Sequence, residues 1–129
     1  MTNTTLKVPR KKMVHRESEI QKASVLWFNF QYPQHRYLLF SVPNGGKRNA
    51  FEAAMLKAEG VKAGVSDIVF LMANKDYHGL CLEFKIAGGK QSKDQLNFEL
   101  SVTNQGFKYE IIRDCNQFII EVSNYINNK

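Results

Sequence analysis

Two acids and a lysine lie in short apolar stretches of this 129-residue sequence. Asp67 begins the stretch DIVF, and Glu83 and Lys85 lie inside LCLEFKI, residues 80–86. Charged side chains next to an apolar core are costly unless an opposite charge or a metal ion compensates them. These three residues are therefore the first candidates for a functional site.

The second stretch has the alternation of a β-strand. Apolar and other residues alternate along 80–86, so Glu83 and Lys85 share one face of the strand. If the strand before it is its antiparallel partner and the turn centres on Lys75, Asp67 lies directly opposite Glu83, roughly 5 Å away. A shift of one residue in register would place Asp67 on the opposite face.

Two carboxylates at such a distance repel each other, and a divalent cation resolves the conflict. Carboxylate and water oxygens are the ligands that Mg²⁺ and Mn²⁺ prefer, and the carbonyl of Phe84 is one further oxygen. Such an ion activates a water and polarises a phosphoryl oxygen, while Lys85 stabilises charge on the phosphate or orients the water. The alternative is structural: Asp67 caps a turn, and Glu83 pairs with Lys85 on a solvated sheet face.

Hydrophobic periodicity and turn residues predict a mixed sheet with helices on its faces, an α/β or α+β architecture. We expect one domain over residues 16–129, preceded by a basic flexible arm, residues 1–15. The expected order α-β-α-β-β-α-β-α assigns helices to 17–31, 47–59, 92–104 and 115–126, and strands to 36–42, 67–72, 79–86 and 107–112.

The first expected helix carries an acid and several aromatic residues. Glu19 shares 4-3-4 spacing with Ala23, Leu26 and Phe30, so it is expected to face inward. The alternative for Glu19 is an ordinary first-turn acid, favoured by the helix dipole. Trp27, Phe28 and Phe30 are interpreted as core residues, with base stacking as the alternative.

The sequence has a net charge of +6, and most of it lies at one end. Residues 1–16 contain five basic residues and no acid. This segment, including Lys11 and Lys12, is expected either to contact nucleic acid or to be a solubilising terminus.

An Asp followed by a hairpin and Glu-x-Lys resembles the PD-(D/E)XK nuclease superfamily, with Ser66 in the place of the proline. Further stretches resemble its VRR-NUC branch: PNGGKR (43–48), EGVKAGVSD (59–67), LCLEFK (80–85), GGKQSKDQ (88–95) and GF (106–107). The resemblance implies the restriction-endonuclease-like α/β core and a Mg²⁺- or Mn²⁺-dependent nuclease that hydrolyses DNA phosphodiesters, without a small-molecule cofactor.

The same resemblance assigns roles to individual residues. Asp67 and Glu83 correspond to the metal-binding acids and Lys85 to the catalytic lysine. Glu19 corresponds to the acid that completes the metal site, and Gln95 to a glutamine that borders it.

Two basic loops are candidate DNA contacts. Lys47 and Arg48 follow two glycines at an expected helix start, where backbone N–H groups favour phosphate. Lys90 and Lys93 lie next to the expected site. For both loops, a solvated turn is the alternative.

Small stand-alone members of the family resemble Holliday-junction resolvases and are often encoded by phages or mobile elements. The resemblance thus implies a homodimer that cuts branched DNA, and the open alternatives are action on RNA and a non-catalytic nucleic-acid binding module. No apolar run reaches the roughly 20 residues of a membrane span, and no secretory signal is expected. Cys81 and Cys115 have no metal-ligand spacing, which is typical of reduced thiols in the cytoplasm. The resemblance implies that this is the cytoplasm of a bacterial or phage-infected cell.

Overall fold

The computed structural model describes residues 9–43 and 49–129. Apart from a short 3₁₀ helix, the elements follow the order predicted from the sequence. They are α1 (Arg10–Gln31), η1 (Pro33–His35), β1 (Leu39–Ser41), α2 (Ala50–Ala58), β2 (Ile68–Phe70), β3 (Leu80–Phe84), α3 (Lys93–Asn104), β4 (Lys108–Ile112) and α4 (Cys115–Asn127).

The strands form one mixed sheet in the order β1-β2-β3-β4. The β1–β2 and β2–β3 pairs are antiparallel, and β3 and β4 are parallel. The connection between the parallel strands runs through α3, as parallel neighbours require. Strand β3 therefore lies inside the sheet, with a partner on each side.

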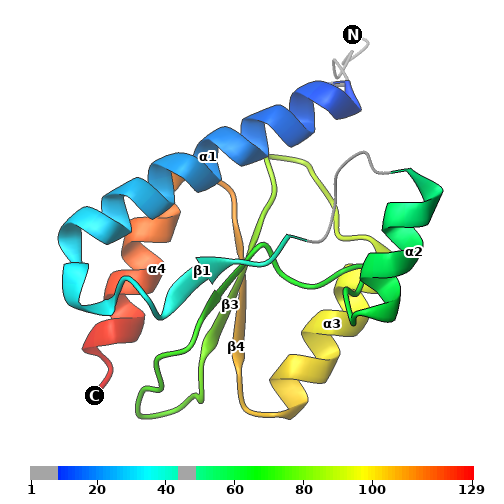
Figure 1. Cartoon of the computed structure of the whole chain (residues 1–129). Coiled ribbons are helices and arrows are strands. Elements are labelled where there is room, and N and C mark those ends of the chain that lie inside the picture. Colours follow the sequence, from blue (N-terminus) through cyan, green and yellow to red (C-terminus); the bar gives the residue numbers. More distant parts are fainter. Residues whose placement is uncertain (1–8, 44–48) are drawn as a thin grey trace, which may run out of the picture.

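Helices cover both faces of the sheet, with α1 and α4 on one side and α2 and α3 on the other (Figure 1). The hydrophobic core lies between the sheet and the α1–α4 pair. Its largest fully buried side chains include Phe28 of α1, Phe84 of β3 and Phe118 of α4. Alternation along β3 sends Leu80, Leu82 and Phe84 into this core and directs Cys81 and Glu83 to the opposite face.

Helix α1 begins earlier than the sequence pattern predicted. It starts at Arg10, after Pro9 at the N-cap, so residues 10–15 are helical and not part of a flexible arm. Arg and Lys are good helix formers, which favours extension of α1 back to Arg10.

Residues 1–8 of the expected arm lie outside the described residues. Within the part of the chain that is described, no helix has the length and apolar character needed to span a bilayer.

Candidate functional site

Asp67 and Glu83 are brought together by the β2–β3 pairing. Ile68 pairs with Leu82, so the residues next in register, Asp67 and Glu83, lie opposite each other. The register predicted from the turn length is confirmed. Asp67 Oδ2 accepts a hydrogen bond of 2.8 Å from the Phe84 N–H. This bond holds the Asp67 carboxylate against the end of β3.

Glu83 is buried, with 3% of its surface exposed. Its Oε1 accepts a hydrogen bond of 2.9 Å from Gln95 Nε2 of α3. Its Oε2 is buried and has no hydrogen-bond partner among the described residues. With both Asp67 and Glu83 ionised, this oxygen lacks a hydrogen-bond donor among the described residues, which is costly in a buried position.

The electrostatics of the pair reflect this cost. Burial and the neighbouring Asp67, through its charge and through a hydrogen bond that forms only when one of the two acids is protonated, together raise the pKa of Glu83 to about 8. Burial also raises the pKa of Asp67, although the Phe84 N–H opposes the shift. At neutral pH the two acids therefore share a proton or require a cation between them.

Lys85 is directed to the acidic side of the site. Its positive charge lowers the pKa of Glu17, Asp67 and Glu83, which places its ammonium group near all three. A Cβ built on Gly89 would come within 3.6 Å of Lys85 Cδ, so the lysine stem packs along this glycine. The predicted grouping of Lys85 with Asp67 and Glu83 on one side of the hairpin thus agrees with the structure.

The third acid near the site is Glu17, and the prediction that Glu19 faces inward is wrong. Glu19 is on the solvent side of α1, with 56% of its side chain exposed, near His15 and Lys22. Glu17 is half-buried, and its Oε1 accepts the Ile86 N–H at 3.4 Å. Burial raises the pKa of Glu17, and Asp67 is among the charges that affect it.

Glu17 and Glu19 lie on different stripes of α1, and the sequence pattern favoured the stripe of Glu19, which faces solvent. Leu26 and Phe30, which share the stripe of Glu19, are 73% and 90% exposed. The stripe that faces the sheet contains Ser24 and Phe28, both fully buried, and Glu17 belongs to it by the same 4-3-4 spacing. That spacing was the available signal, but the polar Ser24 weakened it.

Gln95 is fixed by the start of α3. Its Oε1 accepts the Ser92 N–H and its own N–H donates to Ser92 Oγ, which forms a capping box. Its Nε2 is thereby directed to Glu83. This hydrogen bond to Glu83 agrees with the interpretation of Gln95 as a residue that borders the site.

Close packing brings α3 to the acids. A Cβ on Gly64 would lie 2.4 Å from the carbonyl carbon of Asp94, in the first turn of α3. Only glycine allows this approach. The backbone φ of +85° at position 64 also favours glycine. Ser66, next to Asp67, is buried and donates to the Ile68 carbonyl, which fixes the turn before β2.

Arg113 was not singled out from the sequence, although it stabilises the loop after β3. Its Nη1 donates to the carbonyls of Ile86 and Gly89 at 2.8 and 2.9 Å. The same loop supplies the N–H that binds Glu17. A lone arginine after a strand gives no sequence signal for such a contact, because its partners are backbone atoms far away in the chain.

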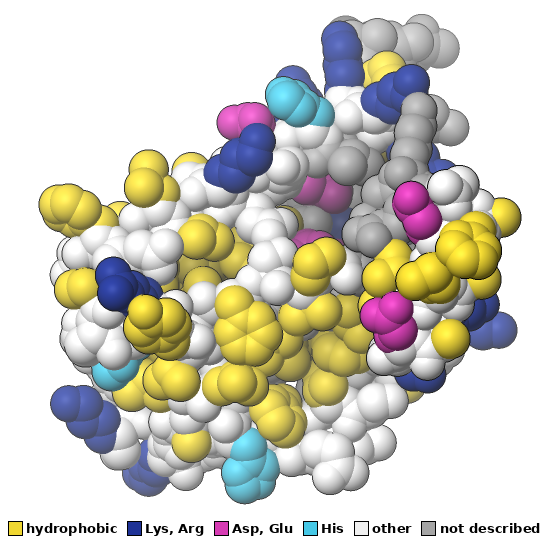
Figure 2. All heavy atoms as spheres, viewed as in Figure 1, with side chains coloured by type: hydrophobic (Ala, Val, Ile, Leu, Met, Phe, Trp, Pro, Cys, Tyr) yellow, Lys and Arg dark blue, Asp and Glu magenta, His cyan; other side chains and the backbone are white. Residues whose placement is uncertain are grey.

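The predicted DNA contacts are dispersed. Lys11 and Lys12 are exposed on the first turns of α1, and Lys90 and Lys93 are exposed in and just after the loop between β3 and α3. Lys47 and Arg48 lie outside the described residues. Figure 2 shows acidic side chains set back in a recess beneath α1, with lysine and arginine side chains on the surface near it.

A divalent cation fits this site by the chemistry of its donors. Asp67 and Glu83 offer carboxylate oxygens, and Glu83 Oε2 has no donor. In residues 9–43 and 49–129, no three or more His, Cys, Asp and Glu side chains lie close enough together to hold a metal ion. Two carboxylates are sufficient for Mg²⁺, because this ion usually keeps several waters and binds one or two carboxylates with substrate phosphates.

Comparisons with known proteins agree with this fold and identify the family. A solved structure described as a VRR_NUC domain protein superposes with a TM-score of 0.75 and 24% identity over 88% of this chain and 89% of that chain. No curated protein matches the chain. The family model of the VRR-NUC domain matches residues 6–114. The chain therefore belongs to the VRR-NUC family of nuclease-type domains.

Proposed function

We propose that this protein is a nuclease that uses Mg²⁺ or Mn²⁺ to hydrolyse phosphodiester bonds in DNA. The observation that supports the proposal best is the buried Glu83 beside Asp67, with Oε2 unpaired in the described part of the chain. A buried acid with a pKa of about 8 is costly to keep ionised. Acids whose pKa is raised strongly by burial and by a neighbouring charge are typical of functional sites.

Asp67 and Glu83 are the residues that would hold the cation, with the Phe84 carbonyl as a further ligand and Glu17 beside them. When bound, a divalent cation supplies Lewis acidity at the phosphate and a water of lowered pKa. The residues of this chain then have distinct tasks. The Phe84 N–H fixes Asp67, and Gln95 fixes Glu83.

The positive charge of Lys85 lowers the pKa of all three acids, Glu17, Asp67 and Glu83. Its ammonium group binds the scissile phosphate and stabilises the negative charge that develops there in the transition state. Contacts of this kind are made to the backbone and carry little sequence information. Lys90, Lys93, Lys11 and Lys12 extend this backbone binding, together with Lys47 and Arg48.

The substrate that we propose is branched DNA, cut by a homodimer. No side chain of the described helix α2 is buried, and its Phe51 is 74% exposed. Phe40 and Leu71 at the β1 edge of the sheet are also exposed, and Figure 2 shows hydrophobic side chains running together across this face. Apolar patches of this kind often mark protein interfaces. Two sites related by a two-fold axis suit paired cuts in a branched substrate.

Two other functions would use the same residues differently. A ribonuclease with this fold would cut matched RNA in preference to DNA. A non-catalytic binding module would hold nucleic acid without cutting it, and its acids would have a structural role only.

The test is a cleavage assay on duplex, flap, fork and four-way junction DNA with Mg²⁺, with Mn²⁺ and with EDTA, alongside matched RNA. The variants Asp67→Asn and Lys85→Met are compared with Asp76→Asn, which changes an exposed turn acid. We expect metal-dependent cutting of branched DNA that the first two variants reduce at least about 100-fold, while Asp76→Asn has no effect.

The DNA affinity of Asp67→Asn in EDTA should stay close to that of the wild type. If the wild-type protein cuts neither DNA nor RNA with either metal ion, the binding module replaces the nuclease. Preferential cutting of RNA would instead support the ribonuclease.

A further inference from the structure

Arg113 connects the end of β4 to the turn that follows β3. It comes directly after β4 and is half-buried. Its Nη1 donates to the carbonyls of Ile86 at 2.8 Å and of Gly89 at 2.9 Å. Among residues 9–43 and 49–129, no acid forms an ion pair with Arg113. In this part of the chain its guanidinium group is therefore held by the backbone of one turn.

The two carbonyls belong to the first and last residues of a β-turn. The Gly89 N–H donates to the Ile86 carbonyl at 3.0 Å, which closes the turn over residues 86–89. Gly88, at the third position, has a φ of +83°, as a type II turn requires. Arg113 thus holds both ends of the turn at a fixed place relative to β4.

The Lys85 side chain packs on this turn. The Lys85 N–H donates to the Ile112 carbonyl at 3.0 Å, so β4 fixes the lysine backbone. A Cβ built on the buried Gly89 would lie 3.5 Å from Lys85 Cβ and 3.6 Å from Lys85 Cδ. The lysine stem is flexible, and without this support its ammonium group could take other directions.

The same turn contacts an acid of the site. The Ile86 N–H donates to Glu17 Oε1 at 3.4 Å. Burial raises the pKa of Glu17, and the positive charges of Lys85 and Arg113 oppose this rise. Arg113 therefore affects Glu17 through the turn and also through its charge.

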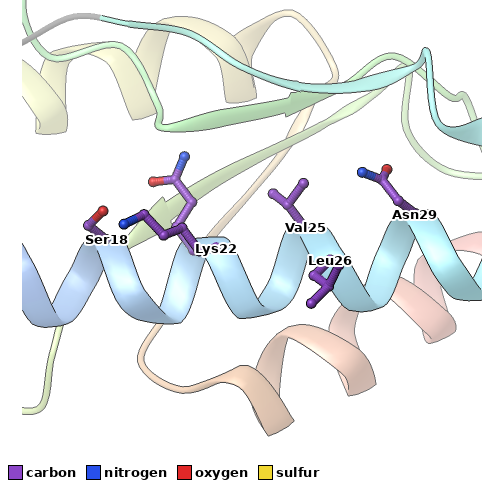
Figure 3. A pocket seen from close by; sticks show the side chains of 6 residues that line it. Ser18, Lys22, Val25, Leu26 and Asn29 are labelled. Atoms are coloured by element: carbon purple, nitrogen blue, oxygen red, sulfur yellow. The ribbon is translucent and has the colours of Figure 1, made fainter.

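A lysine of α1 lies nearby but serves a different surface. Lys22 lines a groove of about 480 Å³ along the helix, together with Ser18, Gln21, Val25, Leu26 and Asn29 (Figure 3). Its ammonium group lies 3.6 Å from the exposed Glu19, and none of Glu17, Asp67 and Glu83 lines this groove. The direction of Lys85 is therefore the one that matters for the three acids.

We propose that Arg113 is a positioning residue that directs the Lys85 side chain to the acids by holding the turn of residues 86–89. This inference rests on the proposed nuclease function, and it adds a residue that controls the cleavage rate without contact with DNA.

The first test measures the single-turnover cleavage rate of Arg113→Ala at saturating DNA, and its DNA affinity in EDTA. The rate should fall at least about tenfold, because a small misplacement of a group at the phosphate is costly. The affinity should stay within about twofold of the wild type, because the DNA contacts themselves remain. Arg113→Lys should lose less activity, because its ammonium group can donate to the same carbonyls, and it also serves if Arg113→Ala does not fold.

Chemical rescue separates the hydrogen bonds of Arg113 from a general loss of stability. Guanidinium chloride, far below the concentration that unfolds the protein, should restore part of the Arg113→Ala rate by donating to the two carbonyls. Sodium chloride at the same concentration should not restore it.

The second test follows Lys85 itself, without DNA or metal. The protein is treated briefly with the N-hydroxysuccinimide ester of acetic acid, and mass spectrometry measures acetylation of each lysine. Lys85 should react at least about fivefold faster in Arg113→Ala, the effect of one lost hydrogen bond on a local opening equilibrium. Lys108, a half-buried lysine of β4, should react at the same rate as in the wild type.

Asn74→Ala is the matched control for stability. Asn74 is half-buried and holds the β2–β3 turn through hydrogen bonds with three backbone groups. This turn lies at the opposite end of the hairpin from Asp67 and Glu83. The variant should unfold at a lower urea concentration, yet keep the wild-type cleavage rate and the wild-type acetylation of Lys85.

Three results would overturn the proposal: unchanged acetylation of Lys85 in Arg113→Ala, a wild-type cleavage rate in this variant, or a DNA affinity that falls as much as the rate. The last would make Arg113 a phosphate contact. If the wild-type protein cuts nothing, yet Lys85 reacts faster in Arg113→Ala and guanidinium reverses this, the positioning role stands and the nuclease fails. If the wild type cuts DNA and Arg113→Ala shows neither effect, the nuclease stands and the positioning role fails.

Discussion

Glu83 links the proposed chemistry to protein stability. In the metal-free protein burial and the neighbouring Asp67 together raise its pKa to about 8, whereas the ordinary value is 4.5. Between these values the folded state binds more protons than the unfolded state. The free energy of unfolding therefore falls as pH rises from about 4.5, and the loss is complete above about pH 8.

This linkage predicts the behaviour of Glu83→Gln. Without metal, the free energy of unfolding of this variant should lose most of its dependence on pH between pH 5 and pH 8.5. It should be more stable than the wild type by about 1–3 kcal/mol at pH 8, because an unpaired buried charge is removed. Thermal unfolding in EDTA across this range measures both effects.

Addition of Mn²⁺ provides the matching control. The ion should raise the melting temperature of the wild type at pH 8 and leave Glu83→Gln nearly unchanged. A wild-type stability that rises with pH over the same interval would contradict the assignment of a raised pKa to Glu83.

Glu17 and Glu19, two positions apart in α1, allow a direct comparison of a half-buried acid near the site with an exposed acid. Glu17→Gln should lower cleavage at least about tenfold, because it removes a charge next to Asp67 and Lys85. Glu19→Gln removes only exposed ion pairs with His15 and Lys22, so activity should stay within about twofold. Initial rates on one DNA substrate decide the point, and the opposite ranking would restore the assignment of Glu19.

Helix α1 shows where local sequence stops determining structure. The spacing of apolar residues predicted a helix correctly, yet two stripes satisfied the same period. The stripe with more apolar residues faces solvent, and the stripe with Ser24 faces the sheet, where its hydroxyl donates to the Ile20 carbonyl. Burial of that hydroxyl is inexpensive because the helix itself supplies the acceptor.

Helix α3 must approach the loop before β2 closely for Gln95 to reach Glu83. Gly64→Ala places a Cβ against the Asp94 backbone and should destabilise the protein by about 2–4 kcal/mol. The added Cβ should also push α3 away from this loop, which moves Gln95 away from Glu83 and should reduce activity. Urea unfolding and cleavage rates measure the two effects.

Gly60→Ala is the control for backbone strain alone. Gly60 also has a positive φ, of 106°, but no described atom lies within 4 Å of an added Cβ. Gly60→Ala should lower the free energy of unfolding by only about 1 kcal/mol and leave activity intact. Equal effects of the two substitutions would show that the contact between Gly64 and α3 has no special importance.

Across the whole chain, the features predicted correctly were those set by nearby residues. The order of elements followed from periodicity and turns, and the opposition of Asp67 and Glu83 followed from the length of one hairpin. The features missed depend on how distant elements pack. The contact of Arg113 with the Ile86 and Gly89 carbonyls is an example, because backbone acceptors leave no trace in the sequence.

The proposed dimer is also a property of the whole molecule. Phe51→Glu places a charge on the exposed face of α2, and it should convert a dimer into a species near the 14.8 kDa of one chain. Light scattering at micromolar concentration measures the mass. Ile120→Glu, on an exposed position of α4, is the control and should leave the dimer intact. A monomeric wild type would contradict the proposed paired cuts.

The most direct test of the account is an anomalous diffraction map from a crystal soaked in Mn²⁺. The account predicts a strong peak that lies about 2.1 Å from carboxylate oxygens of both Asp67 and Glu83, with Lys85 beside it. The peak should disappear in Glu83→Gln. An empty map at this position in the wild-type crystal would contradict the account.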